Sequence, residues 1–414
     1  MGKLLTIAFI VPLLAACSTS EPKVDTTHNL EGHKSFHDTA LIVPDQEHWY
    51  RELRLDNWIS LGVTDQEVAA VLARINGGKT LRDQANENSK GHWTYEFSKE
   101  AEKYNRQARS KSGQAASKLF QKASTMWMIA SYPQLHNPNE LAALENSVNA
   151  YVNMAALRGE TVERVQLPLT DKKLSKPYIT GLLHLPEDVS NAPVLLWTGG
   201  VDKVLTEHYS QIQRYVNNGY AVITFDIPGG GLNTETIIEP GKEHSSHQAA
   251  LAYVQSDARL RNDHVAVLTS SGGGMSLIEF AIRNDDTLSA VVARCAVVDG
   301  VLTKPFLFPK LPLMTAQSFG KRVGANINDL DSYGKYTIPL SLKTKGYFDG
   351  IPRMKTPLLA INTKDDRVAS PEDMAKTAAI SENGQVQFFG EKGHCPHGEA
   401  AEQAIFDFIT SNSK

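Results

Sequence analysis

The strongest constraint on the fold is a series of short apolar segments that alternate with helix-favouring stretches in the second half of the chain. Such segments, rich in Val, Ile, Leu and Phe, are typical of strands buried on both faces. They are PVLLW (193–197), AVITF (221–225), HVAVL (264–268), AVVARCAVV (290–298), PLLAI (357–361) and QVQFF (385–389). Strands that alternate with helices predict a mostly parallel sheet covered by helices on both faces.

The helix-favouring stretches are of two kinds. Those between and after the strands fall near 205–218, 243–257, 273–284, 371–380 and 400–411. Before residue 160, apolar residues recur at three- and four-residue steps, as from Ala116 to Ala130, and Asn137-Pro138 with Glu140 predicts a helix start. We therefore expect a helical domain over 42–160 and an α/β domain over 161–414.

The N-terminus has the features of an export signal. An apolar stretch from Leu4 to Leu14 is too short to span a bilayer, and Leu14-Ala15-Ala16-Cys17 resembles the lipobox of bacterial lipoproteins. This resemblance implies a signal peptide over 1–17, a lipid on Cys17 and a membrane anchor, with 18–41 as a flexible tether. Ser18 after the cysteine favours the outer membrane, facing the periplasm. A plain secretory signal is the alternative.

Composition limits the partners. The net charge is −4, with 42 basic and 46 acidic side chains, so no broad positive field exists for a nucleic acid. Hydrophobic residues make up 41% of the chain, enough for a large core. The expected partners are therefore a small-molecule substrate and, through the anchor, the membrane.

The segment VAVLTSSGGG places Ser271 between a predicted strand and a Gly-rich helix start. A serine on such a tight turn has an exposed Oγ, and the residues two before and two after it must be small. Gly273 meets this condition, whereas Thr269 stands where glycine is usual. Ser270 is the alternative nucleophile, although it would put Leu268 at the first crowded position.

Acids and histidines follow the last two predicted strands. Asp365 and Asp366 come after the strand at 357–361, and His394 comes after the strand at 385–389, with His397 close behind. A histidine there can act as general base on Ser271, and a carboxylate can orient its imidazole. The sequence predicts such a triad and leaves both aspartates and both histidines open.

Two glycine-rich turns are candidates for an oxyanion hole. Such a hole needs one amide from the residue after the nucleophile and one from the loop after an earlier strand. Gly272 supplies the first, and Gly200 with Val201 in the turn WTGGVD supplies the second.

Two other features can affect the site. Cys295 and Cys395 remain once Cys17 is lipidated; we expect two part-buried free thiols, with a disulfide as the alternative. The insertion at 301–355 lacks the strand and helix rhythm, and it forms either a lid or a packed connection.

The motifs WTGGVD, DIPGGG, VAVLTSSGGG, TKDDRVASPED and Gly393-His394 resemble the α/β-hydrolase superfamily over roughly 160–414. The helical region and the turns GGVD and DIPGGG are similar to the branch containing the fermentation–respiration switch protein and 2,6-dihydroxypseudooxynicotine hydrolase. The resemblance implies an α/β-hydrolase fold with an N-terminal helical cap, the triad order Ser, Asp, His, and no metal or organic cofactor. It also implies Asp365 as the acid, because Val368 follows three residues later.

These observations predict a serine hydrolase with the triad Ser271, Asp365 and His394, acting on a carboxylic ester. A C–C hydrolase that uses the same triad on an activated ketone is one alternative. A catalytically inactive envelope binding protein is another, because a fold does not fix a function.

Overall fold

The computed structural model describes residues 53–75, 88–187, 190–349 and 353–413. The predicted signal peptide with Cys17, the predicted tether at 18–41 and the first residues of the predicted helical domain lie outside this part of the chain. None of the helices it contains combines the length and the apolar character needed to cross a membrane.

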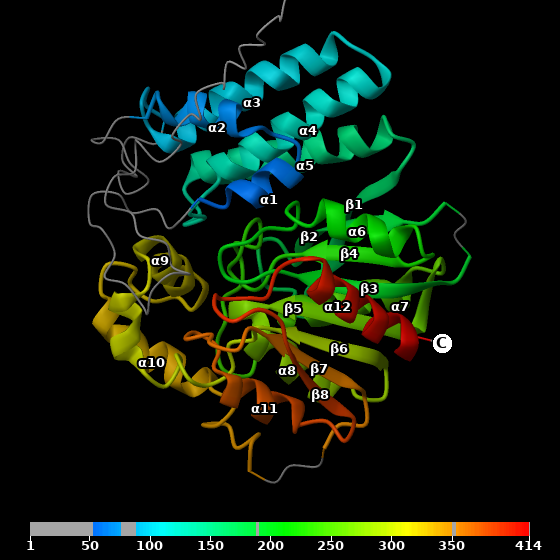
Figure 1. The fold of residues 1–414 in the computed structure, drawn as a ribbon, viewed down its shortest axis with the longest axis vertical. Helices are drawn as coiled ribbons and strands as arrows, with labels where there is room; N and C mark the ends of the chain where they lie inside the picture. The colour runs from blue at the N-terminus through cyan, green and yellow to red at the C-terminus, as the bar shows by residue number, and fades with distance from the viewer. Residues whose placement is uncertain (1–52, 76–87, 188–189, 350–352, 414) are drawn as a thin grey trace, which may run out of the picture.

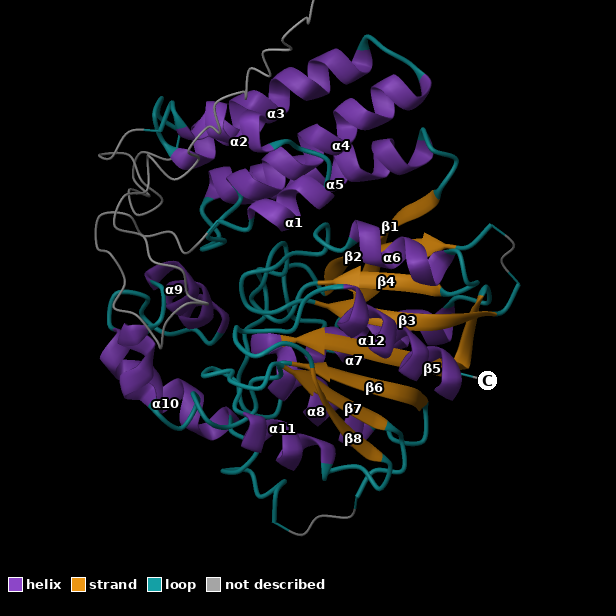
Figure 2. Cartoon of the chain, in the orientation of Figure 1, coloured by secondary structure: helices purple, strands orange, loops and turns teal. Residues whose placement is uncertain are grey.

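Eight strands form one sheet in the order β1-β2-β4-β3-β5-β6-β7-β8 (Figure 2). Strand β2 is antiparallel to both of its neighbours, and the pairs from β4 to β8 are all parallel. The bounds are β1 Thr161–Pro168, β2 Tyr178–Leu185, β3 Ala192–Thr198, β4 Ala221–Phe225, β5 Leu260–Ser270, β6 Leu288–Arg294, β7 Leu358–Asn362 and β8 Gly384–Phe388.

The six predicted strand segments are confirmed as β3 to β8. One is shorter than predicted, because β6 ends at Arg294 and the next residue, Cys295, has a positive φ of 44° that turns the chain out of the sheet. The hairpin β1–β2 was not among the predicted segments. In β1 buried and exposed residues alternate, so it lacks the continuous apolar run of a central strand.

Helices cover both faces of the sheet, as predicted (Figure 1). One face packs against α7 (Ser245–Ser256), α8 (Gly274–Arg283) and α11 (Pro371–Ala378). The other packs against α6 (Tyr209–Val216) and α12 (Glu399–Asn412).

Five further helices lie beside the β1 edge of the sheet (Figure 1). They are α1 Leu55–Ser60, α2 Asp65–Leu72, α3 Trp93–Arg109, α4 Gly113–Ala130 and α5 Pro138–Ala156. The predicted start of α5 is confirmed, because the Asn137 side chain and Glu140 form a capping box. The core of these helices includes Leu182 of β2 and Leu205 after β3, so their apolar faces are buried against the sheet domain.

The insertion after β6 contains α9 (Leu313–Arg322) and α10 (Gly334–Thr337). Buried hydrogen bonds join α9 to the turn between α4 and α5. The Arg322 guanidinium is fully buried and donates to the carbonyl and the side-chain oxygen of Gln134 at 2.7 and 2.9 Å, and Ser318 Oγ donates to the Pro133 carbonyl at 2.7 Å. The insertion is therefore a packed element that bridges the two halves of the molecule.

Candidate active site

Ser271 stands on a sharp turn between β5 and α8. Its φ is 52°, in the left-handed region. This conformation is unfavourable for a residue other than glycine, and such strained residues occur mostly at functional sites. Glycines make the turn possible: a Cβ on Gly272 would lie 2.4 Å from Val201 Cγ1, and a Cβ on Gly274 would lie 2.5 Å from Ala296 Cβ. The turn geometry is that of the nucleophile elbow.

Thr269, the departure from the usual glycine, has a specific partner. Its hydroxyl is fully buried and lies 2.9 Å from His247 Nε2 on α7, and its methyl group fills the space against Gly273. Burial lowers the pKa of His247 to about 3, so this histidine is neutral and can share one hydrogen bond with the hydroxyl. The elbow thus accommodates a threonine because α7 satisfies its hydroxyl.

A continuous chain of hydrogen bonds runs from Ser271 to an aspartate. Ser271 Oγ lies 2.6 Å from His394 Nε2, and His394 Nδ1 lies 2.9 Å from Asp366 Oδ2. The predicted serine and histidine are therefore brought together, and the carboxylate that contacts the histidine is that of Asp366. The expectation of Asp365 is wrong, because its side chain is 54% exposed and points toward Arg367.

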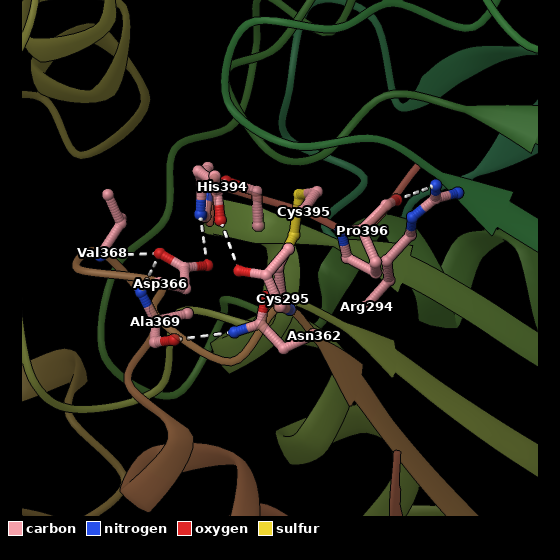
Figure 3. The surroundings of a disulfide bond; sticks show 12 residues. Arg294, Cys295, Asn362, Asp366, Val368, Ala369, His394, Cys395 and Pro396 are labelled. Atoms are coloured by element: carbon pink, nitrogen blue, oxygen red, sulfur yellow. Dashed lines mark hydrogen bonds and ion pairs between the residues drawn. A yellow bond between two sulfur atoms is a disulfide. The ribbon is translucent and has the colours of Figure 1, made fainter. Parts of the chain in front are cut away.

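Asp366 is held in place as well as buried (Figure 3). Its second oxygen, Oδ1, accepts hydrogen bonds from the amides of Val368 and Ala369 at 2.8 and 3.1 Å. Burial by itself raises the pKa of Asp366, but the charge and hydrogen bond of His394 and these two amides hold the pKa below its ordinary value. The group is therefore a carboxylate that can stabilise a protonated imidazole.

The loop that carries His394 is fixed on both sides. Cys395 forms a disulfide with Cys295 at the end of β6, so the expected free thiols are replaced by the alternative bridge (Figure 3). Arg294 donates to the Pro396 carbonyl and pairs with Glu402 at 2.7 Å. Before the histidine, Thr363 Oγ1 donates to the Gly393 carbonyl at 2.6 Å.

Among the described residues, Cys295, His394 and Cys395 are a group whose potential metal ligands lie within 4.8 Å of one another. The two sulfurs are bonded to each other, and metal binding requires free thiolates. The bridged form therefore does not fit a metal centre.

The two predicted oxyanion turns lie against each other. The Cβ position of Gly200 is 2.8 Å from Ser271 Cβ, and the Cβ position of Gly272 is 3.7 Å from the Val201 amide nitrogen. The amides of Gly272 and Val201 therefore belong to two turns that meet beside the serine.

A cavity of about 800 Å³ opens over Ser271 and His394. The insertion and the loop after β6 supply an apolar wall of Val297, Val301, Phe308, Leu311 and Phe319. The cavity also has polar and aromatic lining residues that were not singled out from the sequence, and we call them the polar wall. They include Trp197, Lys203, His208, Arg214 and Arg294, together with the acids Asp202, Glu399 and Glu402.

In this sheet only the second strand is reversed, and a strained serine follows β5. This arrangement defines the class of α/β-hydrolases. Solved structures with the same fold superpose on the chain. The 2,6-dihydroxy-pseudo-oxynicotine hydrolase superposes with a TM-score of 0.67 at 18% identity, covering 86% of this chain and 95% of that structure. AbyA5 superposes with a TM-score of 0.66 at 18% identity, covering 86% and 94%.

Sequence comparison identifies the family of the chain more narrowly than the fold does. The FrsA-like esterase family matches residues 20–410, and the chain belongs to this family. Esterase FrsA of Vibrio cholerae is 30% identical over 349 residues, 82% of both chains. Esterase FrsA of Klebsiella pneumoniae is 28% identical over 359 residues, 84% of both chains. The protein is thus a hydrolase of the esterase type.

Proposed function

We propose that the protein is a serine esterase that cleaves carboxylic esters through Ser271, His394 and Asp366. The observation that carries the proposal is the 2.6 Å contact between Ser271 Oγ and His394 Nε2, continued at 2.9 Å to a buried carboxylate. A nucleophile, a base and an orienting acid in hydrogen-bond contact are what acyl transfer through a serine requires.

The proposed reaction has two halves. His394 takes the proton of Ser271 as Oγ attacks the ester carbonyl, and the amides of Gly272 and Val201 stabilise the oxyanion. His394 then gives its proton to the leaving alkoxide, which departs as an alcohol and leaves an acyl-serine. Water, deprotonated by the same imidazole, releases the acid and restores Ser271.

The test is hydrolysis of p-nitrophenyl esters, together with labelling by a fluorophosphonate, for the wild type, Ser271→Ala and Ser270→Ala. Loss of a triad serine lowers kcat by at least about 10⁴-fold in related chemistry, so Ser271→Ala should lose both signals. Ser270→Ala, one residue away, should still be labelled. Activity that survives in Ser271→Ala would remove this serine as the nucleophile, and a wild type that is never labelled would favour a binding protein.

A further inference from the structure

The polar wall of the cavity contains a lysine next to the predicted oxyanion turn. The Cβ position of Gly199 lies 2.6 Å from Lys203 Cβ and 3.6 Å from its Cδ, so the lysine side chain runs along this turn. Lys203 lines the same cavity as Ser271. Within the described part of the chain, no hydrogen bond or ion pair reaches its ammonium group.

The acids near Lys203 are already paired with arginines. Asp202 and Glu207 both contact Arg54, at 2.6 and 3.2 Å, and Glu402 contacts Arg294 at 2.7 Å. Burial lowers the pKa of Lys203 to about 8, although the negative charges of Glu207 and Asp202 act to raise this pKa. The ammonium therefore lacks a close counter-ion, which an anion in the cavity would supply.

Two aromatic side chains of this wall pack on each other beside the lysine. The rings of Trp197 and His208 stack with centroids 5.0 Å apart, and both side chains line the cavity. Trp197 Nε1 and His208 Nε2 have no hydrogen-bond partner among the described residues and are closed off from solvent, so the two rings act as a wall and their nitrogens do not contact a ligand. His208 Nε2 is also only 3.5 Å from the Cβ position of Gly199, so it lies beside the same turn as Lys203.

The chemistry of this site favours a ligand that accepts hydrogen bonds. A lysine ammonium carries three hydrogen-bond donors and no acceptor. Burial is the main reason that the pKa of His208 lies well below its usual value, so its ring is neutral and Lys203 is the charged group at this turn. A group with several acceptor oxygens and a negative charge satisfies the ammonium best.

We propose that Lys203 binds a carboxylate of the substrate, in a subsite whose wall includes the stacked rings of Trp197 and His208. The inference rests on the proposed esterase function and names its substrate class: esters that carry a free carboxylate on a hydrocarbon chain. The chain would lie along the apolar wall of the same cavity, which includes Val297 and Phe308. Lys203 is then a specificity residue, separate from the residues that break the ester bond.

The experiment compares two substrates of nearly equal shape, mono-p-nitrophenyl adipate and its methyl ester, which lacks the charge. The readout is the ratio of kcat/KM for the two substrates in a single preparation, because this ratio does not depend on the fraction of folded enzyme. A charge-assisted hydrogen bond predicts that the wild type prefers the carboxylate about ten- to a hundredfold. In Lys203→Met the ratio should fall toward one, mainly through KM.

Two further variants separate a specific subsite from general charge attraction. Lys203→Arg keeps the charge and should keep part of the preference. Lys392→Met removes an exposed lysine at another part of the same cavity and should keep most of it. Free adipate should inhibit methyl-ester hydrolysis more strongly in the wild type than in Lys203→Met, and inorganic phosphate tests whether the site prefers another anion.

The outcomes distinguish the two proposals. If both substrates are hydrolysed equally by the wild type, or if Lys203→Met keeps the full preference, the carboxylate subsite is wrong and the esterase stands. Stronger inhibition by phosphate than by adipate would also overturn the carboxylate assignment. If neither ester is hydrolysed by the wild type, the esterase proposal itself fails.

Discussion

At the scale of single residues, the choice between Asp365 and Asp366 depends on which way two adjacent side chains point. Asp365 pairs with Lys392 in an isolated parallel bridge, and its amide donates to the Glu391 carbonyl at 2.8 Å. Successive side chains of an extended chain point to opposite sides, so the next residue, Asp366, faces His394. The spacing of residues in the sequence could place an acid at the end of this strand, but it could not show which of the two aspartate side chains points toward the histidine.

The two aspartates offer a matched pair of variants. Asp366→Asn should lower kcat for ester hydrolysis by about 10³- to 10⁴-fold, because an amide favours the wrong tautomer of the histidine and stabilises its protonated form poorly. Asp365→Asn should stay within about twofold of the wild type, as expected for an exposed surface change. Steady-state kinetics on one p-nitrophenyl ester compare them directly. A large loss in Asp365→Asn would contradict the geometry described above.

Thr269 shows a second limit of reasoning from sequence. Its position predicted a crowded elbow, because glycine is usual there. The hydrogen bond to His247 on α7, 22 residues earlier, makes the threonine acceptable. Nothing in the local sequence indicated that these two residues meet.

At the scale of elements, continuous apolar runs predicted β3 to β8 well, because central parallel strands are buried on both faces. The β1–β2 hairpin was missed because β1 is an edge strand with exposed positions. Pairing of Cys295 with Cys395 also could not be predicted. The two residues are 100 positions apart, and they become neighbours only when the end of β6 and the loop after β8 meet.

The disulfide closes a long loop, so its removal should cost stability. A loop of 100 residues corresponds to about 4 to 5 kcal/mol in the chain-entropy description. We expect Cys295→Ala/Cys395→Ala to unfold at a lower urea concentration than the oxidised wild type, and to match the wild type treated with a reductant. Thiol titration of the unfolded wild type checks that the bridge is present. Equal midpoints for oxidised wild type and variant would contradict a stabilising bridge.

At the scale of the whole molecule, buried histidines couple stability to pH. Burial is the main cause that lowers the pKa of His184 to about 4 and of His247 to about 3, and it places the pKa of His208 well below its usual value. In the unfolded chain each would titrate near about 6.5. Below that pH the unfolded state binds protons that the folded state does not, so stability is lost as the pH falls.

This coupling predicts a falling free energy of unfolding between pH 6.5 and 5. Each fully buried neutral histidine contributes a slope of up to about 1.4 kcal/mol per pH unit. Urea unfolding at pH 7.5, 6 and 5 measures the slope, and His247→Gln should reduce it even if the variant is less stable at neutral pH. A free energy that does not change over this range would show that these histidines are protonated in the folded protein.

The helices α1 to α5 are tied to the sheet domain by buried polar contacts as well as by apolar packing. Arg54 bonds to Asp202 and Glu207, Tyr151 Oη lies 3.0 Å from His184 Nε2, and Arg322 reaches the turn before α5. Moving these helices away from the sheet domain would break these contacts and expose the apolar surfaces that pack between the two parts. The cavity is also lined by exposed residues of α1 (Asp56 and Ser60), of the His394 loop (Lys392) and of the start of α12 (Glu399). We therefore expect substrates to be sorted by their cross-section at a mouth of fixed width, and turnover to proceed without a domain movement.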